Sequence, residues 1–178
     1  MSITVKGMFL KNLVETVKQK KGPEGLKKLE DKFGDLRFSG IKDYPVETEI
    51  KLQKAAMEVI FGKVSPDNYV EFGKLGFLTY ANSLIGKTIF SLLGKDVKKI
   101  ALGVPTAINT ISSGFKITVT DLGAQKVSIR MINNPYITQY YEGVYKGAME
   151  YLNVQGKIEV NVLREHDYEY ILEWDKRI

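Results

Sequence analysis

The sequence predicts an α+β fold, in which an N-terminal helical half is followed by a ββαββ half with a mainly antiparallel four-stranded sheet. Two observations lead to this prediction. The apolar residues recur with a period of about 3.6 as far as roughly residue 112, and the period then changes to about 2. Beyond the change, two alternating runs, one helical stretch and two more alternating runs follow in order. Strands and helices that segregate in this way are typical of an α+β protein.

Length and composition indicate one ordinary globular domain. The 178 residues can form a substantial core, and we expect a single domain over 1–178, with a helical half of about 1–112 and an αβ half of about 113–178. The absence of cysteine excludes disulfides, thiolate zinc sites and cysteine nucleophiles. With a single histidine as well, we expect neither a metal site nor a cofactor.

The formal charge of +5 raises the question of polyanion binding. Acidic residues are interleaved with the lysines, which is typical of a solvated surface, so we expect no specific nucleic-acid partner. No stretch approaches the roughly 20 apolar residues that span a bilayer, and the N-terminal residues do not have the pattern of an export signal. We therefore expect a cytoplasmic protein without a membrane span.

In the first half, the spacing of apolar residues predicts a series of helices. Residues 3–20 form an amphipathic pattern that Gly22 ends, and a short helix over 23–33 follows. A proline at a first-turn position begins the next helix, over 45–61. Residues 66–93 are too densely apolar for one narrow stripe, so we expect the central, most buried helices there.

The second half alternates as strands do, with one long helix between two pairs of strands. The alternating side chains predict a hairpin, then a helix that begins at a proline and ends at a glycine, then a second hairpin. A short helix precedes the first strand. The expected elements are a helix over 105–111, strands over 115–119 and 127–131, a helix over 135–156, and strands over 157–164 and 168–174.

One segment, Ala81–Thr88, matches a relaxed phosphate-binding P-loop with alanine at its first position. A working P-loop needs a buried strand before it, so that backbone N–H groups and a helix N-terminus converge on the phosphates. The preceding residues have a helical pattern instead, and no doubly wound βαβ series follows. We interpret the match as a false positive in a turn between helices, and we expect no enzymatic activity.

Two further features have structural explanations that we favour. His166, between Glu165 and Asp167, is expected in a surface turn, with a catalytic base or metal ligand as the alternative; no G-x-S-x-G nucleophile motif accompanies it. Gly143 and Gly147 allow another backbone to approach the long helix. We expect tight packing of that helix on the sheet, with ligand clearance or a dimer contact as alternatives.

Aromatic residues concentrate in the central helices and around the long helix. Such residues either fill an ordinary core, which we favour, or form the walls of an apolar pocket. They are Phe72, Phe77, Tyr80, Phe90, Phe115, Tyr136, Tyr140 and Tyr141.

Nearly the whole chain resembles an uncharacterised bacterial family of about this length that is prominent in myxobacteria. The likeness is carried by residues 5–17, the central helices through 94, the hairpin around 113–123 and, above all, residues 142–174 with their glycine-spaced helix. That family is itself similar to haem-NO-binding and vinyl-reductase domains and to the related TRAPP transport-protein fold. The resemblance implies a ligand-sensing or assembly domain.

The sequence departs from these relatives in the residues that bind their ligands. Haem-NO-binding domains use an axial histidine in the helix before the sheet and a Tyr-x-Ser-x-Arg motif for the haem propionates. Here no histidine precedes His166, and the nearest match, Lys126–Arg130, has lysine in place of tyrosine. Vinyl-reductase-type domains often carry zinc-binding cysteines, which are absent. We therefore expect a haem-independent, metal-free domain.

Our first hypothesis is a non-catalytic sensor or carrier of a small, apolar molecule, held in a cavity between the central helices and the sheet. Arg130 would anchor an anionic group if its strand face turned inward. The alternative is a protein-interaction or scaffold domain that acts as a homodimer, as the transport-protein fold would imply. The cavity would be bounded by Phe72, Tyr80, Phe115, Met131, Tyr140 and Tyr141.

Overall fold

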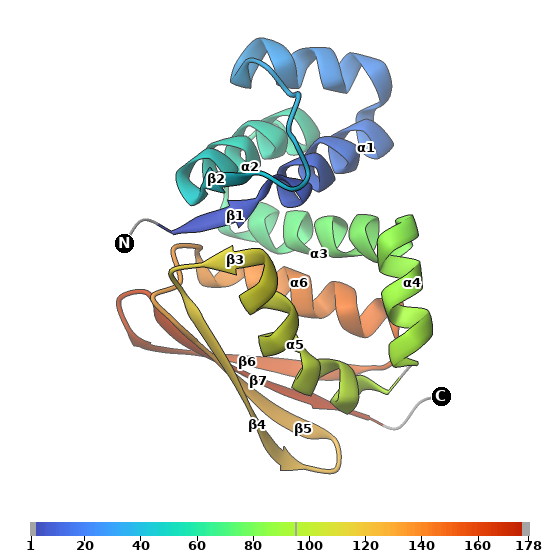
Figure 1. Ribbon diagram of the computed structural model, residues 1–178, viewed down its shortest axis with the longest axis vertical. Helices are drawn as coiled ribbons and strands as arrows, with labels where there is room; N and C mark the ends of the chain where they lie inside the picture. The colour runs from blue at the N-terminus through green and yellow to red at the C-terminus, as the bar shows by residue number, and fades with distance from the viewer. Residues whose placement is uncertain (1–2, 95, 176–178) are drawn as a thin grey trace.

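The computed structural model describes residues 3–94 and 96–175, and it stacks a helical part on a sheet part (Figure 1). Helices α1 and α2 lie farthest from the sheet, and α3 and α6 lie side by side in the middle. Helix α4 stands at one side of the molecule, and α5 lies in front of the sheet. The helices are α1 (Gly7–Phe33), α2 (Val46–Phe61), α3 (Pro66–Asn82), α4 (Leu84–Leu93), α5 (Val97–Ile111) and α6 (Thr138–Tyr151).

The predicted four-stranded antiparallel sheet is confirmed. Its strand order is β4-β5-β7-β6, so the two hairpins meet through β5 and β7. Ile129 and Val160 both lie opposite Tyr170, and this register places the apolar residues of the strands on the face that α6 covers. The α+β prediction is therefore correct. The strands are β4 (Lys116–Gly123), β5 (Lys126–Ile132), β6 (Gly156–Arg164) and β7 (Asp167–Trp174).

A second, small sheet was not predicted. Strand β1 (Thr4–Lys6) lies between β2 (Asp43–Pro45) and β3 (Ser112–Ser113), and both pairings are antiparallel. The expected helix over 3–20 thus begins only at Gly7. Strands of two or three residues are too short to show alternation, so no periodic signal predicts them.

Glycine and proline end the first helical segment as predicted. Gly22 has a φ of 64° and a ψ of −159°, which breaks α1, and Pro23 opens its second segment. A positive φ of this kind has little steric cost only for glycine. The two helices expected over 3–20 and 23–33 are therefore the two arms of α1.

The turn expected within Ala81–Thr88 is also confirmed. Helix α3 ends at Asn82, and the Ser83 side chain caps α4 by accepting a hydrogen bond from the Gly86 N–H at 3.1 Å. The preceding element is a helix and not a strand, so the backbone geometry of a phosphate-binding loop is absent from this segment.

Helix α5 is longer than the short helix expected over 105–111, and it begins at Val97. Asp96 precedes it and accepts a hydrogen bond from the Lys99 N–H on Oδ1 at 3.0 Å, which satisfies a free donor of the first turn. Pro105 lies inside the helix rather than at its start. A helix start at Pro105 is therefore wrong, because the residue that caps the helix is Asp96.

The glycine-spaced face of α6 packs on α3, and not on the sheet as we expected. A Cβ on Gly143 would lie 2.0 Å from the Val70 carbonyl oxygen, and one on Gly73 would lie 2.1 Å from the Tyr140 carbonyl oxygen. Only hydrogen atoms at these positions let the two backbones approach so closely. The helical half and the sheet half are therefore joined through a tight α3–α6 contact.

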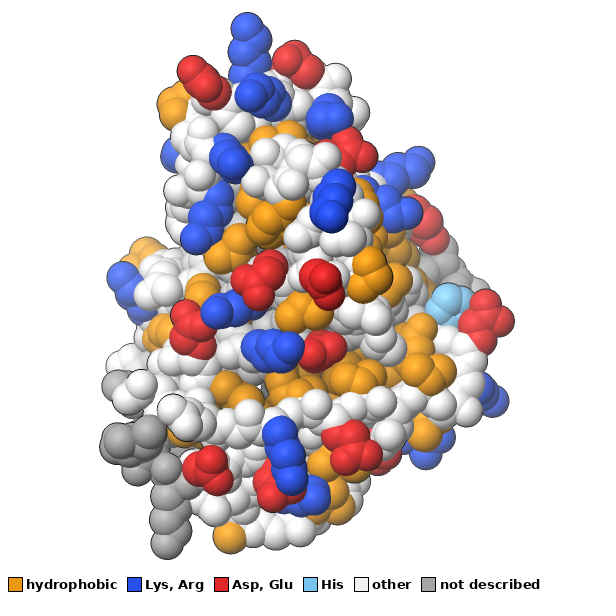
Figure 2. Space-filling view, turned by 180° about the vertical axis from the view of Figure 1, so that it is seen from behind, with side chains coloured by type: hydrophobic (Ala, Val, Ile, Leu, Met, Phe, Trp, Pro, Cys, Tyr) orange, Lys and Arg blue, Asp and Glu red, His pale blue; other side chains and the backbone are white. Residues whose placement is uncertain are grey.

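One face of the molecule has the predicted solvated charge pattern. On the face turned away in Figure 1, Lys and Arg side chains alternate with Asp and Glu over the helical part (Figure 2). Within the described residues, no helix is both long and apolar enough to cross a membrane.

Candidate functional site: a buried tyrosine cluster

Five tyrosines, three buried and two partly buried, form a continuous cluster along α6. The ring centroids are 5.5 Å apart for Tyr136 and Tyr140, and 5.5 Å apart for Tyr140 and Tyr141. They are 6.2 Å apart for Tyr141 and Tyr145, and 5.1 Å apart for Tyr145 and Tyr170 of β7. Rings at these separations attract one another beyond their hydrophobic burial. The cluster, which we call the tyrosine cluster, links the core of the helical half to the core of the sheet.

Helical spacing and hydrogen bonds in the preceding loop determine where these rings lie. Tyr141 and Tyr145 are four residues apart on α6 and so project from the same face. Tyr136 is held before the helix, because its N–H donates to Asn134 Oδ1 at 3.1 Å. The Asn134 N–H in turn donates to the His166 carbonyl oxygen at 2.7 Å. This loop is thereby fixed to the turn between β6 and β7.

A carboxyl group from α2 reaches the same cluster. Glu49 is only 3% exposed, and its Oε2 accepts a hydrogen bond from the Tyr136 hydroxyl at 2.5 Å. Its Oε1 accepts one from Gln53 Nε2 at 3.3 Å. Burial raises the pKa of Glu49 to about 7, although the hydrogen bonds from Tyr136 and Gln53 oppose that rise. Glu49 therefore changes its protonation near neutral pH.

The tyrosine hydroxyls are neutral hydrogen-bonding groups. Burial is the main cause that raises the pKa of Tyr136, Tyr141 and Tyr145 well above 10. The Tyr170 hydroxyl donates to the Thr138 carbonyl oxygen at 3.2 Å. The Tyr145 hydroxyl is buried, and the described part of the chain offers it no hydrogen-bond partner. A buried polar atom of this kind normally finds a partner, such as a ligand or an ordered water.

Comparison with known proteins identifies the family. A family model described as "Protein of unknown function (DUF2378)" matches residues 1–175. The chain belongs to the DUF2378 family. No match was found among the curated proteins.

Solved structures share the fold of this DUF2378 chain. An oxygen binding H-NOX domain related to soluble guanylate cyclases is 11% identical with a TM-score of 0.78, and the match covers 97% of this chain and 96% of that one. A mutant H-NOX protein from S. oneidensis in the Fe(II) ligation state is 16% identical with a TM-score of 0.77, over 97% of each chain. An Fe(II) unliganded H-NOX mutant from K. algicida is 14% identical with a TM-score of 0.70, over 97% of this chain and 98% of that one. The expected resemblance to haem-NO-binding domains is therefore confirmed for the fold.

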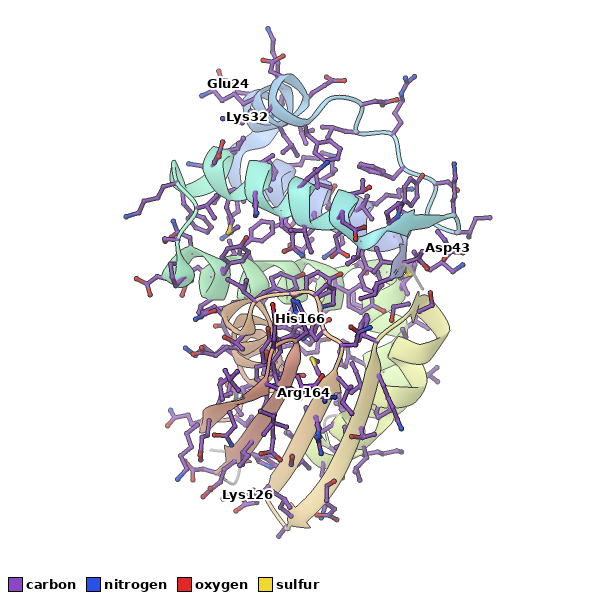
Figure 3. All side chains as sticks on the ribbon, turned by 90° about the vertical axis from the view of Figure 1, so that its left-hand side faces the viewer. Glu24, Lys32, Asp43, Lys126, Arg164 and His166 are labelled. Atoms are coloured by element: carbon purple, nitrogen blue, oxygen red, sulfur yellow. The ribbon has the colours of Figure 1, made fainter. Side chains whose placement is uncertain are left out.

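The residues of the DUF2378 chain do not fit a histidine-ligated haem, the group that this fold family implies. The chain has one histidine, and α5, the helix before the sheet, contains none. His166 lies in the turn between β6 and β7, where its φ is 63° and about half of its side chain is exposed (Figure 3). The described residues also hold no group of three His, Cys, Asp or Glu side chains that would bind a metal. The prediction of a surface turn at His166 is confirmed.

The structure brings several predicted site residues together. Tyr140 and Tyr141 are part of the tyrosine cluster, and the fully buried Phe72 packs in the same helical core. Met131 and Phe115 belong to the sheet core, which Tyr141 also contacts. These five residues lie in the two cores that α6 joins.

Tyr80 and Arg130 lie elsewhere. Tyr80 is half-buried near the end of α3, outside both core clusters. Arg130 is exposed, because its neighbours Ile129 and Met131 on β5 take the inward face. Because successive residues of a strand point to opposite faces, Arg130 points away from the core. It therefore cannot anchor an anionic ligand between the helices and the sheet.

The nearest match to the propionate motif also faces outward. On β5, Ser128 has the same orientation as Arg130, and its hydroxyl donates to Glu169 Oε1 at 2.6 Å. Ser128 thus has a partner on the outer face of the sheet, away from α6. Lys126 of the same motif pairs with Glu173 at 3.0 Å.

Sequence reasoning missed Glu49, Gln53 and the two tyrosines nearest the sheet, Tyr145 and Tyr170. A signal for the first two was present, because Glu49 and Gln53 occupy positions on α2 that share a face with Leu52, Ala56 and Met57. Polar residues on an apolar helix face are rarely buried without partners. Their position therefore indicated a buried hydrogen-bond network.

Proposed function

We propose that this chain is a non-catalytic small-molecule-sensing domain that works without haem, and that its ligand binds against the tyrosine cluster. The observation that carries the proposal is the unpartnered, buried hydroxyl of Tyr145. It lies among apolar and aromatic side chains at the junction of α6 and the sheet. A small, largely apolar molecule with one hydrogen-bonding atom matches these surroundings.

The fold supports a sensing role. The solved structures that share it include an oxygen binding domain. The family and the fold are consistent with a non-enzymatic domain. The residues that reach the tyrosine cluster are tyrosines with raised pKa values, an amide and one buried carboxyl group. Such groups can bind and orient a ligand, and the buried carboxyl group would couple binding to pH.

Native mass spectrometry of the purified protein, followed by denaturing extraction, tests this proposal. We expect a bound small molecule in a stoichiometric amount, and we expect Tyr145→Phe to lose most of it, because the ligand then lacks its hydrogen bond. Tyr151→Phe is the matched control: it makes the same change on α6, but its ring packs on Phe77 and Phe90, outside the cluster.

Two results would contradict the proposal. Haem in the extract would disprove haem independence. A bound molecule that both variants retain equally would show that Tyr145 has no part in the site, and a protein without any bound molecule would count against sensing by a tightly held ligand.

A further inference from the structure

Helix α4 carries a stripe of large apolar side chains that none of the described residues covers. Leu84 is 83% exposed, Leu92 79%, Ile85 55% and Ile89 37%. Most large apolar residues elsewhere in the described chain are buried or partly buried. Contiguous exposed apolar surface of this kind usually marks an interaction site. We call these four residues the α4 stripe.

Helical geometry gathers the α4 stripe on one side. At about 100° per residue, its members fall within one arc, in which Thr88 lies between Leu84 and Leu92. The Thr88 hydroxyl donates to the Leu84 carbonyl oxygen at 2.9 Å, so the single polar group on this arc is already hydrogen-bonded within the helix. The whole arc can therefore enter an apolar medium without leaving a side-chain hydroxyl unpaired.

The opposite side of α4 is fixed to the rest of the molecule. A Cβ on Gly86 would lie 2.0 Å from the Tyr80 carbonyl oxygen, so the helix backbone touches the end of α3. The Phe90 ring packs at 4.9 Å from Tyr151 and 5.9 Å from Phe77. These contacts hold the inner side of α4, and the α4 stripe on the other side is exposed. Helix α4 itself lies at the edge of the molecule (Figure 1).

The surrounding segment is basic and nearly free of carboxylates. Between Glu71 and Asp121 the sequence has one acidic residue, Asp96, whose carboxylate caps α5. The same segment has six basic residues, of which Lys74 pairs with Glu150 and Lys98 with Asp121. The six are Lys74, Lys87, Lys95, Lys98, Lys99 and Lys116.

Lys87 on α4 and Lys99 in the first turn of α5 are the cations of this segment that remain available. Both side chains are exposed, and among the described residues no carboxylate lies within ion-pair distance of either. Lys87 lies on α4 itself, one turn after Leu84, at the margin of the stripe. A lysine in that position can lay its alkyl chain along apolar surface while its ammonium group reaches phosphate.

We propose that the α4 stripe docks onto the surface of an anionic lipid bilayer. Leu84, Ile85 and Leu92 would enter the boundary between headgroups and acyl chains, and Lys87 and Lys99 would lie beside anionic headgroups. The charge of this segment favours an anionic bilayer over a second copy of the chain. A second copy of the chain would bring two carboxylate-poor, lysine-rich segments together without partners for their charges. The proposal is independent of the tyrosine cluster and of its ligand.

Flotation of the full chain with lipid vesicles tests the proposal. We expect binding to vesicles of phosphatidylcholine with a quarter phosphatidylglycerol, weaker binding to phosphatidylcholine alone, and release by high salt. The double substitution Leu84→Gln and Leu92→Gln should weaken binding roughly tenfold or more. Replacing Lys87 or Lys99 by Gln should weaken it about fivefold each.

The matched control changes two exposed apolar residues on β6, by Val162→Gln and Leu163→Gln, and should bind as the unaltered chain does. Circular dichroism and thermal unfolding verify that each variant is folded. Failure of the unaltered chain to bind anionic vesicles, or equal binding by the Leu84 and Leu92 variant, would overturn the proposal. A dimer that this variant abolishes would assign the α4 stripe to a second copy and would overturn it as well.

Discussion

Helices α6 and α4 are both rich in apolar and aromatic residues, but their surroundings differ completely. Around α6, backbone contacts α3 at Gly143 and rings fill the space toward the sheet. Around α4, one side is fixed at Gly86 and the other carries the exposed α4 stripe. An apolar pattern therefore identifies a face that requires a partner, and only the tertiary structure shows whether the chain itself supplies that partner.

The two helices should also differ in how strongly substitutions on them affect folding. Where α6 packs on α3 and on the sheet, an added carbon or an added charge has no space and no solvent, so small changes should have large effects on folding. On the α4 stripe, a polar substitution meets solvent and should leave folding almost unaffected. Three measurements examine this difference.

The largest effect is expected from Gly73→Ala at the α3–α6 contact. Its Cβ would lie 2.1 Å from the Tyr140 carbonyl oxygen, a backbone atom that cannot move aside alone. We expect the free energy of unfolding to fall by about 3 kcal/mol or more, measured by urea denaturation. Gly76→Ala is the control on the same helix: nothing lies within 4 Å of its Cβ, so stability should rise slightly. A similar loss in both variants would contradict the close contact.

The next effect concerns the buried carboxyl group of Glu49. Its pKa is raised to about 7, above the 4.5 of an exposed glutamate, so the folded state holds its proton over a range in which the unfolded state has lost it. Stability from this group is fully present below pH 4.5 and is lost as the pH rises toward and through 7. We therefore expect the free energy of unfolding to fall by about 3 kcal/mol over that range, relative to Glu49→Gln.

Denaturant unfolding at a series of pH values measures this dependence. Glu47→Gln is the matched control, because Glu47 lies on the same helix and is exposed. It should leave the pH dependence unchanged. If Glu49→Gln retained the full pH dependence of the unaltered chain, the proton at Glu49 would not be its source.

The smallest effect is expected on the exposed helix. Leu92→Gln should change the free energy of unfolding by less than about 0.5 kcal/mol, because Leu92 is already largely in solvent. Leu52→Ala on α2, where the side chain is fully buried, should lower it by about 2–5 kcal/mol. Thermal and urea unfolding give both values. A large loss for Leu92→Gln would show that the α4 stripe has a partner within the folded chain.

Much of the fold was predictable because its elements are long and periodic. The two hairpins, the helix between them and the break at Gly22 follow from alternation, helical spacing and glycine conformation. The small sheet was not predictable, since Thr4–Lys6 pairs with residues about 40 and 109 positions away in elements too short to show a period. The start of α5 was missed although Asp96 is a recognisable cap.

The candidate site was predictable only in part. Tyr140 and Tyr141 were found because aromatic residues at helical spacing on a long helix indicate a buried face. Their neighbours Tyr170 and Glu49 come from β7 and α2, and no sequence pattern relates those elements to α6. The partner of the glycine-spaced face was likewise a question of tertiary arrangement, so α3 was not foreseen there.

Strand β1 also constrains the order of events during synthesis on the ribosome. Its first neighbour, β2, is made about 40 residues later, but its second neighbour, β3, exists only once Ser113 has been made. Until then one edge of β1 remains open, with unpaired backbone groups that another chain can pair with. The earliest of the described strands thus completes its pairing only after helices α1 to α5 have been made.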